Sequence, residues 1–456
     1  MTAHVPALVA GAGISGLVCA YALRKAGIDA RIVESAAVPG GVIRSERREA
    51  YLLEFGPQSF NASAAVLKLC RELHIEDRLV QAPPKAPRFV LINGKLLRVP
   101  LTPPALLSSS LFSSKSKMRV LRDFLGHSTP PENDESVAAF VRRKFSPEVL
   151  EKLVGPFVSG IYAGDPEKLS LRGAFPQLHE AERSSGSVIR GMLRAGKMNG
   201  AASAKPTLQT FRDGNQTLIA ALAANLGASL RCGVEVRAAR IAPETAAGPV
   251  FEVTAIANGR EEIIKTERLI IATPSLQASS LLRGIDPQFE PSLKRIEYAP
   301  VAVVSLGYAL TSIRHSLDGF GFLVPRSSGL RILGTVWNTS LFSNRAPQGH
   351  ALLTSFLGGA TDPQAISLSE SQLVSNVHRE LAAILGISQE PLFSSVWTYD
   401  RAIPQFNIGH AETMNFLTEL QSKYPRLWLA GNYWRGPSLA VCIEQALTIA
   451  QQVGKS

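Results

Sequence analysis

The stretch VPALVAGAGISG, residues 5–16, decides the fold of this chain. Its apolar first half, Val5–Ala10, predicts a short buried strand of a parallel sheet. Gly11, Gly13 and Gly16 then fit the G-x-G-x-x-G pattern of a strand that turns directly into a helix. Gly11 permits the tight turn, Gly13 lets the backbone approach a pyrophosphate, and Gly16 lets the helix pack closely on the strand.

The next predicted strand, Arg31–Glu34, ends on a carboxylate. Glu34 follows Gly16 by eighteen residues, a position from which it can accept hydrogen bonds from the hydroxyl groups of an adenosine ribose. The N-terminus of the intervening helix favours the negative charge of phosphates. The strand, the glycines, the helix and the carboxylate together predict a nucleotide-binding βαβ unit, but they leave open which adenine dinucleotide binds there.

Further glycine turns indicate which adenine dinucleotide binds. The loop after the second strand carries Gly40-Gly41 and Arg44, and another turn follows at Gly56-Pro57. Near the end of the chain the strand–glycine–helix pattern recurs around Gly431, so a second helix N-terminus can meet a distant part of a long cofactor. By analogy, this spacing of loops favours FAD over NAD.

The composition is that of a large, basic, globular chain. Its 456 residues exceed the usual size of a single core, so we expect two or three interleaved domains. The net charge of +11 suits an anionic membrane surface or an acidic small substrate. Nucleic acid is not expected, because the basic residues are scattered and form no nucleic-acid-binding motif. A basic surface with no partner is the alternative.

The four cysteines, Cys19, Cys70, Cys232 and Cys442, lie far apart in the sequence. Without a C-x-x-C pair they predict no zinc site, iron–sulfur cluster or disulfide framework, and we expect free thiols in a reducing compartment. The first strand starts by about Val5, which leaves no room for a signal peptide. Since no stretch of about 18 apolar residues occurs either, a cytoplasmic protein without transmembrane segments is expected.

Strand patterns in the second half predict another sheet. Arg88–Pro100 predicts a hairpin that turns at Asn93-Gly94. Four later segments alternate as antiparallel strands do, and Ser369–Leu385 predicts a helix that packs on them. The four segments are Ala302–Leu306, Gly321–Val324, Ile332–Val336 and Leu352–Phe356.

Shorter patterns complete the expected elements. Helices are predicted at Ala64–Leu73 and Thr217–Leu226, and strands at Ser229–Val236 and Arg268–Pro274. Glycine, alanine and serine dominate Gly196–Pro206, which predicts a loop.

The segment from residue 101 to about 205 is helical in character, with predicted helix starts at Ser136 and Ser146. It begins with the apolar stretch Pro100–Phe112, which is followed by cations that could meet lipid phosphates if the stretch enters one leaflet of a membrane. A helix packed on its own domain is the equal alternative. The cations are Lys115, Lys117, Arg119 and Arg122.

Several stretches along nearly the whole chain match one family. The most specific are APRFV at 86–90, which contains Arg88, and GPFVSGIYAGDP at 155–166. The others are residues 39–41, 56–57, 319–325, 344–347 and 430–433. With these stretches and the opening glycines, the chain resembles the FAD-dependent, plant-type protoporphyrinogen oxidases of the flavin amine oxidase-like superfamily.

The resemblance implies an enzyme of haem biosynthesis that oxidises protoporphyrinogen IX to protoporphyrin IX with FAD. Six electrons pass to three O2, which leave as hydrogen peroxide. It further implies hydride transfer from a methylene bridge carbon to flavin N5, with loss of a proton from a pyrrole nitrogen. Arg88 would hold a propionate as the single cation of an apolar slot, with Leu323 and Val336 on one side and Phe356 near the ring.

The resemblance also implies a set of cofactor contacts, but it assigns no general base. The eight histidines form no cluster, and no Asp or Glu is singled out. Pro437 departs from the family pattern, in which a small or β-branched residue is expected. The implied cofactor contacts are Gly11, Gly13, Gly16, Glu34, Gly41, Arg44, Gly56, the backbone of Val236, and Gly431.

Three other functions remain open at this stage. The first is oxidation of coproporphyrinogen III to coproporphyrin III. The second is a flavin amine oxidase or carotenoid-type desaturase, for which Tyr433-Trp434 hints at an aromatic cage although no matching lysine is evident. The third is a flavin-free binding protein on the same fold, as in the Rab GDP dissociation inhibitors.

The expected fold class is α/β: a Rossmann-like FAD-binding domain, a substrate domain with an antiparallel sheet, and an α-helical, membrane-associating domain. The expected boundaries are residues 1–82, 207–292 and 401–456 for the first domain, 83–99 and 293–400 for the second, and 100–206 for the third. Peripheral contact with the cytoplasmic face of an anionic membrane and a homodimer are also expected.

Overall fold

The opening strand and helix form as the glycine pattern predicts. β1 (Thr2–Ala10) runs into α1 (Ile14–Lys25) through Gly11, whose φ of +101° is a conformation that a side chain would strain. Gly13 is the N-cap residue of α1. The computed structural model describes residues 2–100, 102–199, 207–242 and 250–455.

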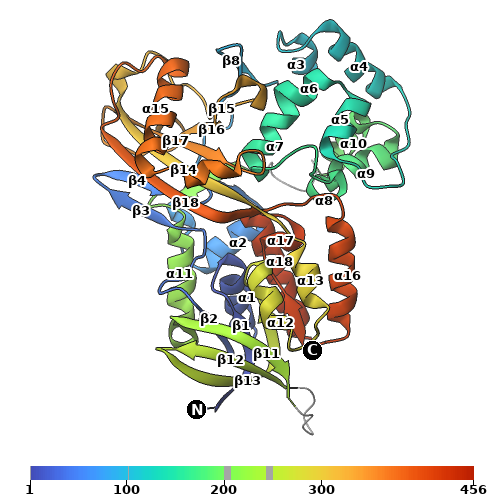
Figure 1. Ribbon diagram of the computed structural model, residues 1–456, viewed down its shortest axis with the longest axis vertical. Coiled ribbons are helices and arrows are strands. Elements are labelled where there is room, and N and C mark those ends of the chain that lie inside the picture. The colour runs from blue at the N-terminus through green and yellow to red at the C-terminus, as the bar shows by residue number, and fades with distance from the viewer. Residues whose placement is uncertain (1, 101, 200–206, 243–249, 456) are drawn as a thin grey trace.

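β1 belongs to a seven-stranded sheet at the lower end of the molecule (Figure 1). The strand order is β10-β2-β1-β13-β12-β11, with β19 paired to β13. β1 is parallel to β2 and β13, whereas β12 is antiparallel to β11 and β13. The bounds are β2 Ala30–Glu34, β10 Leu230–Cys232, β11 Val234–Ile241, β12 Phe251–Ala257, β13 Arg260–Ile271 and β19 Leu427–Leu429.

The prediction of one strand at Ser229–Val236 is wrong. Gly233 has a φ of +70° and separates β10 from β11. A residue in this left-handed region cannot continue a strand, so the two halves pair with different neighbours, β10 with β2 and β11 with β12.

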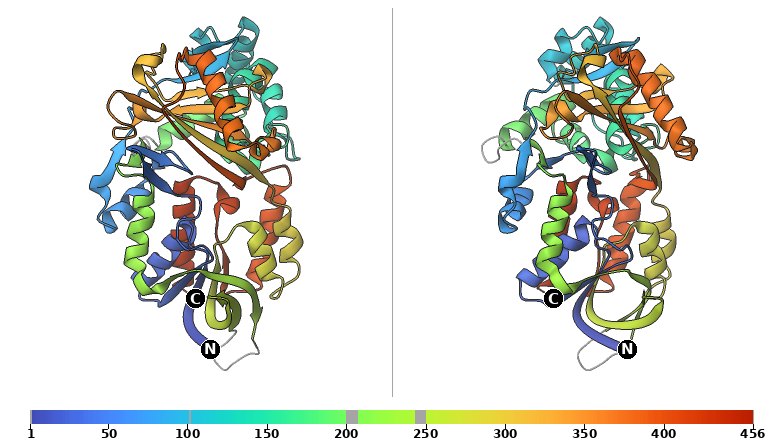
Figure 2. Two further views of the ribbon diagram at one scale, coloured as in Figure 1. Left: turned by 60° about the vertical axis from the view of Figure 1, so that its left-hand side comes forward. Right: turned by 90° about the vertical axis from the view of Figure 1, so that its left-hand side faces the viewer.

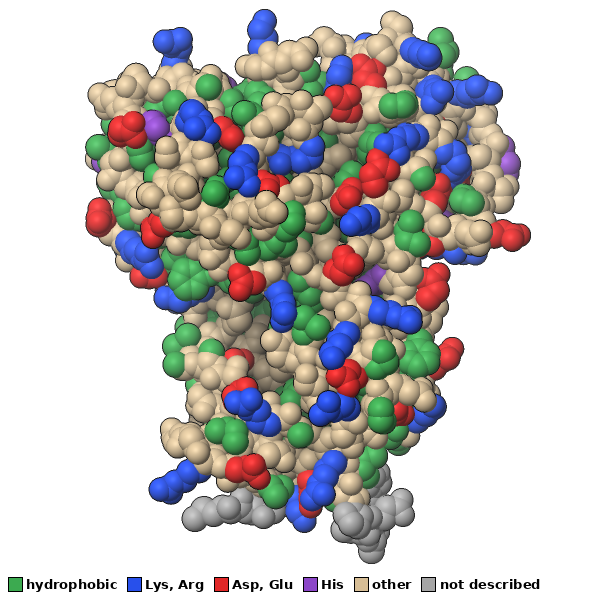
Figure 3. Space-filling model, viewed as in Figure 1, with side chains coloured by type: hydrophobic (Ala, Val, Ile, Leu, Met, Phe, Trp, Pro, Cys, Tyr) green, Lys and Arg blue, Asp and Glu red, His purple; other side chains and the backbone are tan. Residues whose placement is uncertain are grey.

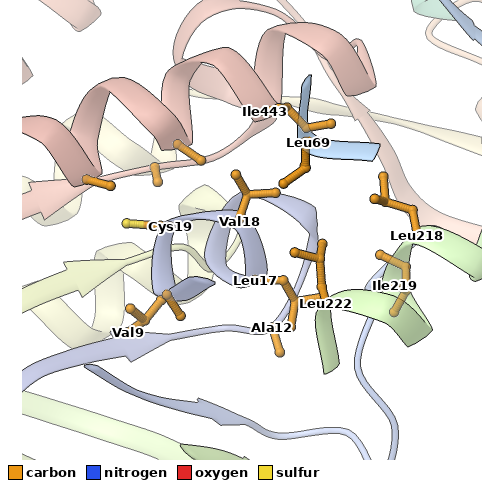
Figure 4. Close-up of a cluster of buried hydrophobic side chains, with 14 of the residues drawn as sticks. Val9, Ala12, Leu17, Val18, Cys19, Leu69, Leu218, Ile219, Leu222 and Ile443 are labelled. Carbon is orange, nitrogen blue, oxygen red and sulfur yellow. The ribbon is translucent and has the colours of Figure 1, made fainter. Parts of the chain in front are cut away.

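Helices cover both faces of this sheet. On one face α1, α2 (Ala64–Glu72), α11 (Gln216–Leu226) and α18 (Leu439–Val453) meet in a buried apolar cluster (Figure 4). On the other face lie α12 (Ser275–Leu282), α13 (Phe289–Lys294) and α16 (His410–Ser422). The predicted helices at 64–73 and 217–226 are thus confirmed to within one residue.

A second seven-stranded sheet lies at the upper end of the molecule, with α15 (Glu370–Leu385) on its outer face (Figure 2). Its strand order is β18-β14-β17-β16-β15-β7-β8. The bounds are β7 Arg88–Ile92, β8 Lys95–Arg98, β14 Tyr298–Ala309, β15 Gly321–Leu323, β16 Ile332–Trp337, β17 His350–Gly358 and β18 Phe393–Pro404.

The predicted hairpin, strands and helix of this sheet are confirmed, and one pairing differs. The turn at Asn93-Gly94 has positive φ at both residues, as the hairpin requires. β7 is parallel to β15, although the sheet was expected to be antiparallel. No short connection joins these two strands, which lie about 230 residues apart, so neither direction is imposed on the pair.

Two small sheets and two short helices connect these parts. β3 (Ser45–Arg48) pairs with β4 (Tyr51–Glu54), and β9 (Thr207–Phe211) pairs with β5 (Phe60–Ala62) and β6 (Leu79–Gln81). The helix α14 (Asn338–Leu341) follows β16, and α17 (Asn432–Arg435) follows β19.

Helices α3 to α10 form the upper right of Figure 1. Ser136 and Ser146 cap α5 and α6, which confirms both predicted starts. The loop expected from Gly196 is wrong as far as Asn199, because α10 continues through this glycine at a cost of only about 1 kcal/mol; residues 200–206 lie outside the described residues. The bounds are α3 Pro103–Ser108, α4 Ser114–Leu125, α5 Val137–Lys144, α6 Pro147–Val149, α7 Gly155–Tyr162, α8 Leu171–Ala174, α9 Pro176–Ser185 and α10 Val188–Asn199.

The apolar stretch before α4 is only partly exposed. Leu111 and Phe112 are buried in the core of the helical part, where they pack with Val137 and Phe140, while Leu107 stays 41% exposed. Within the described ranges, no helix combines the length and the apolar character needed to cross a membrane.

Candidate active site

The N-terminus of α1 borders an open space. A side chain at Gly16 would begin 1.9 Å from the carbonyl oxygen of Gly11, and one at Gly11 would begin 2.9 Å from that of Ala272, so both glycines allow close packing. Apart from its chain neighbours, no described residue has an atom within 4 Å of the position that a Cβ of Gly13 would take. No side chain caps α1, so the N–H groups of its first turn are available to an anion in this space.

Glu34 is fixed at the edge of this space by backbone donors. One carboxylate oxygen accepts from the backbone N–H of Ala12 at 2.7 Å, and the other accepts from that of Ala36 at 2.9 Å. A carboxylate offers about four lone-pair positions, so Glu34 keeps acceptor capacity for ribose hydroxyls.

A second glycine loop faces the same space. A side chain at Gly41 would begin 3.5 Å from the Cα atom of Gly13, so the two glycines are near neighbours. The loop is held by the backbone N–H of Gly40, which donates to the carbonyl of Ala12 at 2.8 Å. Gly56 lies behind the loop, where a side chain would begin 2.1 Å from the carbonyl of Val42.

These features fit FAD. An uncapped helix start, two glycines that leave its approach open and a fixed carboxylate are the groups that a pyrophosphate and a ribose need. One buried hydroxyl group nearby, that of Thr273, has no hydrogen-bond partner within the part of the chain that the structure describes; the backbone nitrogen of this residue would lie 3.1 Å from a Cβ of Gly11. A bound cofactor can supply such partners.

Three other predicted cofactor contacts, Gly431, Val236 and Arg44, lie in different structural elements. Gly431, with a φ of +146°, starts α17 at the carboxyl end of β19. Val236 lies next to a β-bulge in β11, which leaves a backbone group outside the ladder. The exposed guanidinium of Arg44 lies over the ring of Trp397, 4.9 Å from its centre. The roles of these three residues stay predictions.

Sequence reasoning missed a buried ion pair behind the second loop. The Arg345 guanidinium donates to Glu54 Oε1 at 3.1 Å and to Thr210 Oγ1 at 2.7 Å. Glu54 also accepts from Ser45 and from the backbone N–H of Asn215. Burial raises the pKa of the Glu54 carboxyl, although Arg345 and the hydrogen bonds oppose this change. The pair thereby ties the cofactor loop to α11 and to the segment before β17.

The register of the upper sheet places the four predicted substrate residues on one face. Arg88 is the partner of Gly321 in the parallel pair, and Gly321 is opposite Val336. Leu323 is opposite Gly334, which in turn is opposite Phe356 on β17. Since residues directly opposite each other share a face, all four side chains leave the sheet on the side away from α15.

One end of this face opens into a cavity of about 790 Å³. Its walls come from the β7–β8 hairpin, the loop before it, the segment around α3, and the start of β9. Arg88 lines the cavity and lies over the ring of Phe320, 5.1 Å from its centre. The side chains of Phe320 and Val336 pack against the same buried cluster, but Leu323, Val336 and Phe356 are not among the described residues that line the cavity.

The expectation of a single cation in an apolar slot stays a prediction. Lys85 and Arg98 line the same cavity as Arg88, whereas no Asp or Glu is among the described lining residues. Local sequence could not reveal this, because Lys85 lies in a proline-rich loop and Arg98 reads as an ordinary exposed strand residue. Only the fold of the hairpin brings residues from these three places to one cavity, and Arg98, opposite Phe89, leaves the sheet on the face away from Arg88.

No metal site accompanies these groups in the described ranges, where His, Cys, Asp and Glu form no cluster of three or more that could hold an ion. The four cysteines are free. On the face shown in Figure 3, basic side chains are interspersed with acidic ones rather than gathered into one patch.

A family described as flavin containing amine oxidoreductase matches residues 14–454 of the chain. The chain is 35% identical over 473 residues to a chloroplastic protoporphyrinogen oxidase from Nicotiana tabacum, with 99% of this chain and 86% of that protein covered. It is 28% identical over 458 residues to a coproporphyrinogen III oxidase from Bacillus subtilis, which covers 96% of this chain and 95% of that protein.

Solved structures share the fold. A crystal structure from an Exiguobacterium species, provisionally assigned as a protoporphyrinogen oxidase, has a TM-score of 0.81 at 23% identity and covers 99% of both chains. A reduced UDP-galactopyranose mutase has a TM-score of 0.72 at 16% identity, with 98% of this chain and 95% of that chain covered. At these identities the likeness concerns the fold alone.

Proposed function

The chain belongs to the flavin-containing amine oxidoreductases as a relative of the protoporphyrinogen oxidases, and we propose that it oxidises protoporphyrinogen IX to protoporphyrin IX. It is an FAD-dependent oxidoreductase. Six electrons leave the macrocycle, and three O2 are reduced to three H2O2.

The observation that carries this proposal is the face of the upper sheet that holds Arg88, Leu323, Val336 and Phe356. A porphyrinogen is a large apolar ring with carboxylate tails. A row of apolar side chains suits the ring, while the guanidinium at one end suits a carboxylate because it can donate two parallel hydrogen bonds.

In this proposal the protein binds, orients and shields the substrate. When bound, FAD supplies the two-electron oxidation and passes the electrons to O2. Arg88 holds a propionate and so sets which bridge carbon lies nearest the cofactor loops, while Leu323, Val336 and Phe356 exclude water from the ring. No side chain is assigned as a general base.

Coproporphyrinogen III is the second candidate substrate. It carries four carboxylates instead of two, and the three cations of the cavity favour additional negative charge. The same cations disfavour an amine oxidase, since a cationic amine would enter a cavity that none of the described Asp or Glu residues lines.

The experiment is anaerobic reduction. Each porphyrinogen is added without O2 to the purified protein, and bleaching of the visible flavin band is followed. Rapid bleaching by protoporphyrinogen is expected, and faster bleaching by coproporphyrinogen would name that substrate instead. If neither porphyrinogen bleaches the flavin, the proposal fails; a purified protein with no flavin band would speak for a flavin-free binding protein.

We also propose a three-part chain in which the helical part contacts an anionic membrane surface at the cytoplasmic face. The strands of the two large sheets support the division, although β18 extends four residues past the boundary at 400. α4 exposes Met118 and Leu125 by 64% and 71%, next to exposed cations such as Lys115. Cosedimentation with phosphatidylglycerol vesicles should therefore weaken in high salt. A homodimer stays a prediction.

A further inference from the structure

The loop that follows Gly41 leads to an arginine that is held by two aromatic rings. The guanidinium of Arg44 lies over the ring of Trp397, 4.9 Å from its centre, and 5.6 Å from the centre of the Phe55 ring. The centres of these two rings are 5.0 Å apart. Phe55 follows β4, and its backbone N–H donates to the carbonyl of Arg44 at 3.0 Å, whereas Trp397 belongs to β18. Arg44 therefore lies where the cofactor loops meet the upper sheet.

Trp397 belongs to the face of the upper sheet that holds Phe356. Both residues are opposite Val303 of β14, so their side chains leave the sheet on the same side. The ring of Trp397 packs against the apolar cluster that includes Phe356 and also against the one that includes Phe55. Burial raises the pKa of the Tyr399 phenol, two residues further along β18, to about 12, and the charge of Arg44 opposes this rise. The charge of Arg44 thus acts on this face.

The charge of Arg44 is only weakly neutralised. Among the described carboxylates its one partner is Glu46, at 3.5 Å. That carboxylate already accepts two hydrogen bonds from Arg48, each at 2.9 Å. The side chain of Arg44 is 45% exposed. Arg44 can therefore still stabilise a negative charge on a bound group.

A cofactor bound at the start of α1 has to pass this arginine. Gly41, three residues before Arg44, lies beside Gly13 at that helix start. The ring of FAD has to lie close to its substrate, because electron transfer requires the two to be in contact. Arg44 spans the distance between these points, since its loop begins beside the helix start and its guanidinium ends at the face that holds Phe356.

We propose that Trp397 is a positioning residue, which holds the guanidinium of Arg44 beside the flavin ring of bound FAD. A positive charge at this place favours the reduced ring, which carries a negative charge at neutral pH. Tryptophan suits the task because its ring face attracts a cation more strongly than that of tyrosine or phenylalanine. The inference concerns the cofactor, so it goes beyond the proposed function and does not depend on which porphyrinogen is oxidised.

The midpoint potential of the flavin tests this inference. It is measured on the holoenzyme without substrate, by stepwise reduction in the presence of a dye of known potential. In R44M we expect the equilibrium constant of reduction to fall roughly tenfold, which lowers the potential of a two-electron couple by about 30 mV. In W397L the fall should be about three- to fivefold, or about 15–20 mV. W397F keeps a ring under the guanidinium and should stay within about twofold of the parent.

The double variant shows whether Trp397 acts through Arg44. The potential of R44M/W397L should be no lower than that of R44M, because the ring has no guanidinium left to hold. The matched control is R47M. Arg47 is an exposed cation of the same hairpin, lies over no described ring and donates to the carbonyl of Ala50 at 3.4 Å. Its replacement should leave the potential unchanged.

Three results would overturn the inference: a parent-like potential in R44M, a parent-like potential in W397L, or losses that add fully in the double variant. If W397L does not retain FAD, R44K decides. Lysine keeps the charge but stacks less well on a ring, so a lowered potential is expected and a parent-like one contradicts the role of Trp397. Because no porphyrinogen is present, failure of the proposed function is detected separately, in the anaerobic reduction.

Discussion

At the residue scale, Arg88 joins the cavity to the substrate face. Arg88 is at the exposed start of β7, and its guanidinium lies over the ring of Phe320. Its backbone is fixed by the neighbouring strands, and the backbone N–H of Val99 donates to its carbonyl at 2.8 Å. The guanidinium is therefore free to bind a ligand, because no described side chain forms an ion pair with it.

Replacing Arg88 by alanine should raise the Michaelis constant for the porphyrinogen. A hydrogen bond to a charged group contributes about 1.5–3 kcal/mol, so we expect roughly a tenfold rise or more, with a smaller change in the turnover number. R88K keeps the charge but loses the paired donors, and it should fall between the parent and R88A. Steady-state kinetics measure this, with K95A as the control, and an unchanged Michaelis constant in R88A would remove Arg88 from the site.

Gly13 gives a separate test of the cofactor site. Its φ of −69° suits any residue and, chain neighbours aside, no described residue lies within 4 Å of its missing Cβ, so we expect valine to fit there without a clash. In G13V we expect the apoprotein to lose only about 1 kcal/mol, because valine is a poor N-cap residue. The dissociation constant of FAD should rise roughly tenfold or more, equivalent to at least about 1.4 kcal/mol, because the side chain enters the space left for the pyrophosphate.

Titration of the apoprotein with FAD, followed by flavin fluorescence, measures this change. Gly196 provides the control, since it lies within α10, has no other described residue within 4 Å of its Cβ position and is remote in sequence from the glycine loops. G196A should bind FAD as the parent does. Parent-like affinity in G13V would mean that the pyrophosphate does not lie over Gly13.

At the scale of elements, the local sequence predicted the helices and strands whose formation depends on interactions between neighbouring residues. Serine caps, the turn at Asn93-Gly94 and the alternation of the upper strands each depend on neighbouring residues, so their elements were found. Pairing of distant segments depends on tertiary structure instead. The parallel pairing of β7 with β15 and the link between Glu54 and Arg345, 291 residues apart, leave no local signal.

The same reasoning explains what could be predicted of the site. The glycines and Glu34 form a contiguous motif with a known geometry, so their neighbourhood could be inferred. Lys85 and Arg98 belong to no motif, and their position along the same cavity as Arg88 follows only from the folded hairpin and the helical segment packed beside it.

A buried charge network joins α4, α5 and α9 in the helical part. Glu182 accepts from two nitrogens of Arg143, each at 2.8 Å, and from Ser128, while Lys144 contacts Asp123 at 2.6 Å. Burial alone would raise the pKa of Glu182, but the hydrogen bonds from Arg143 and Ser128 outweigh it and lower this pKa from 4.5 to about 2.

The lowered pKa makes the stability of this part depend on pH. The contribution of Glu182 is fully present above pH 4.5 and should be lost as the pH falls from 4.5 to about 2. Denaturant unfolding at several pH values should show this loss in the parent. E182Q should be less stable at pH 7, by about 2 kcal/mol or more, with a flatter pH dependence. E180Q, two residues away on the exposed side, is the control, and equal slopes in E182Q and the parent would contradict the assignment.

At the scale of the whole molecule, buried polar contacts are among those that join the cofactor loops to the upper sheet. Arg345, in the segment before β17, pairs with Glu54 at the end of β4, and both side chains are about 2% exposed. Asn338 of α14 donates to Gln58 at 2.7 Å, just beyond Gly56. These buried polar contacts act together with the apolar packing of Tyr51, Leu53 and Phe55 against Leu352 and Phe393 of the upper sheet.

Removing one partner of the buried pair should affect stability and cofactor retention together. R345M leaves the Glu54 charge buried and without its cation, which costs about 3–5 kcal/mol. Because Glu54 also holds Ser45 and the start of α11, we expect R345M to release FAD faster than the parent. E54Q/R345M should recover much of the stability, since an uncompensated charge no longer remains, yet it should still release FAD faster because the link between the two parts is gone.

Thermal unfolding and flavin release on dilution measure the two effects. R78M is the control, because the surface pair of Arg78 with Asp213 contributes at most about 1 kcal/mol. If E54Q/R345M regained both stability and the parent's rate of FAD release, the pair would be a local stabiliser and would not position the cofactor loop.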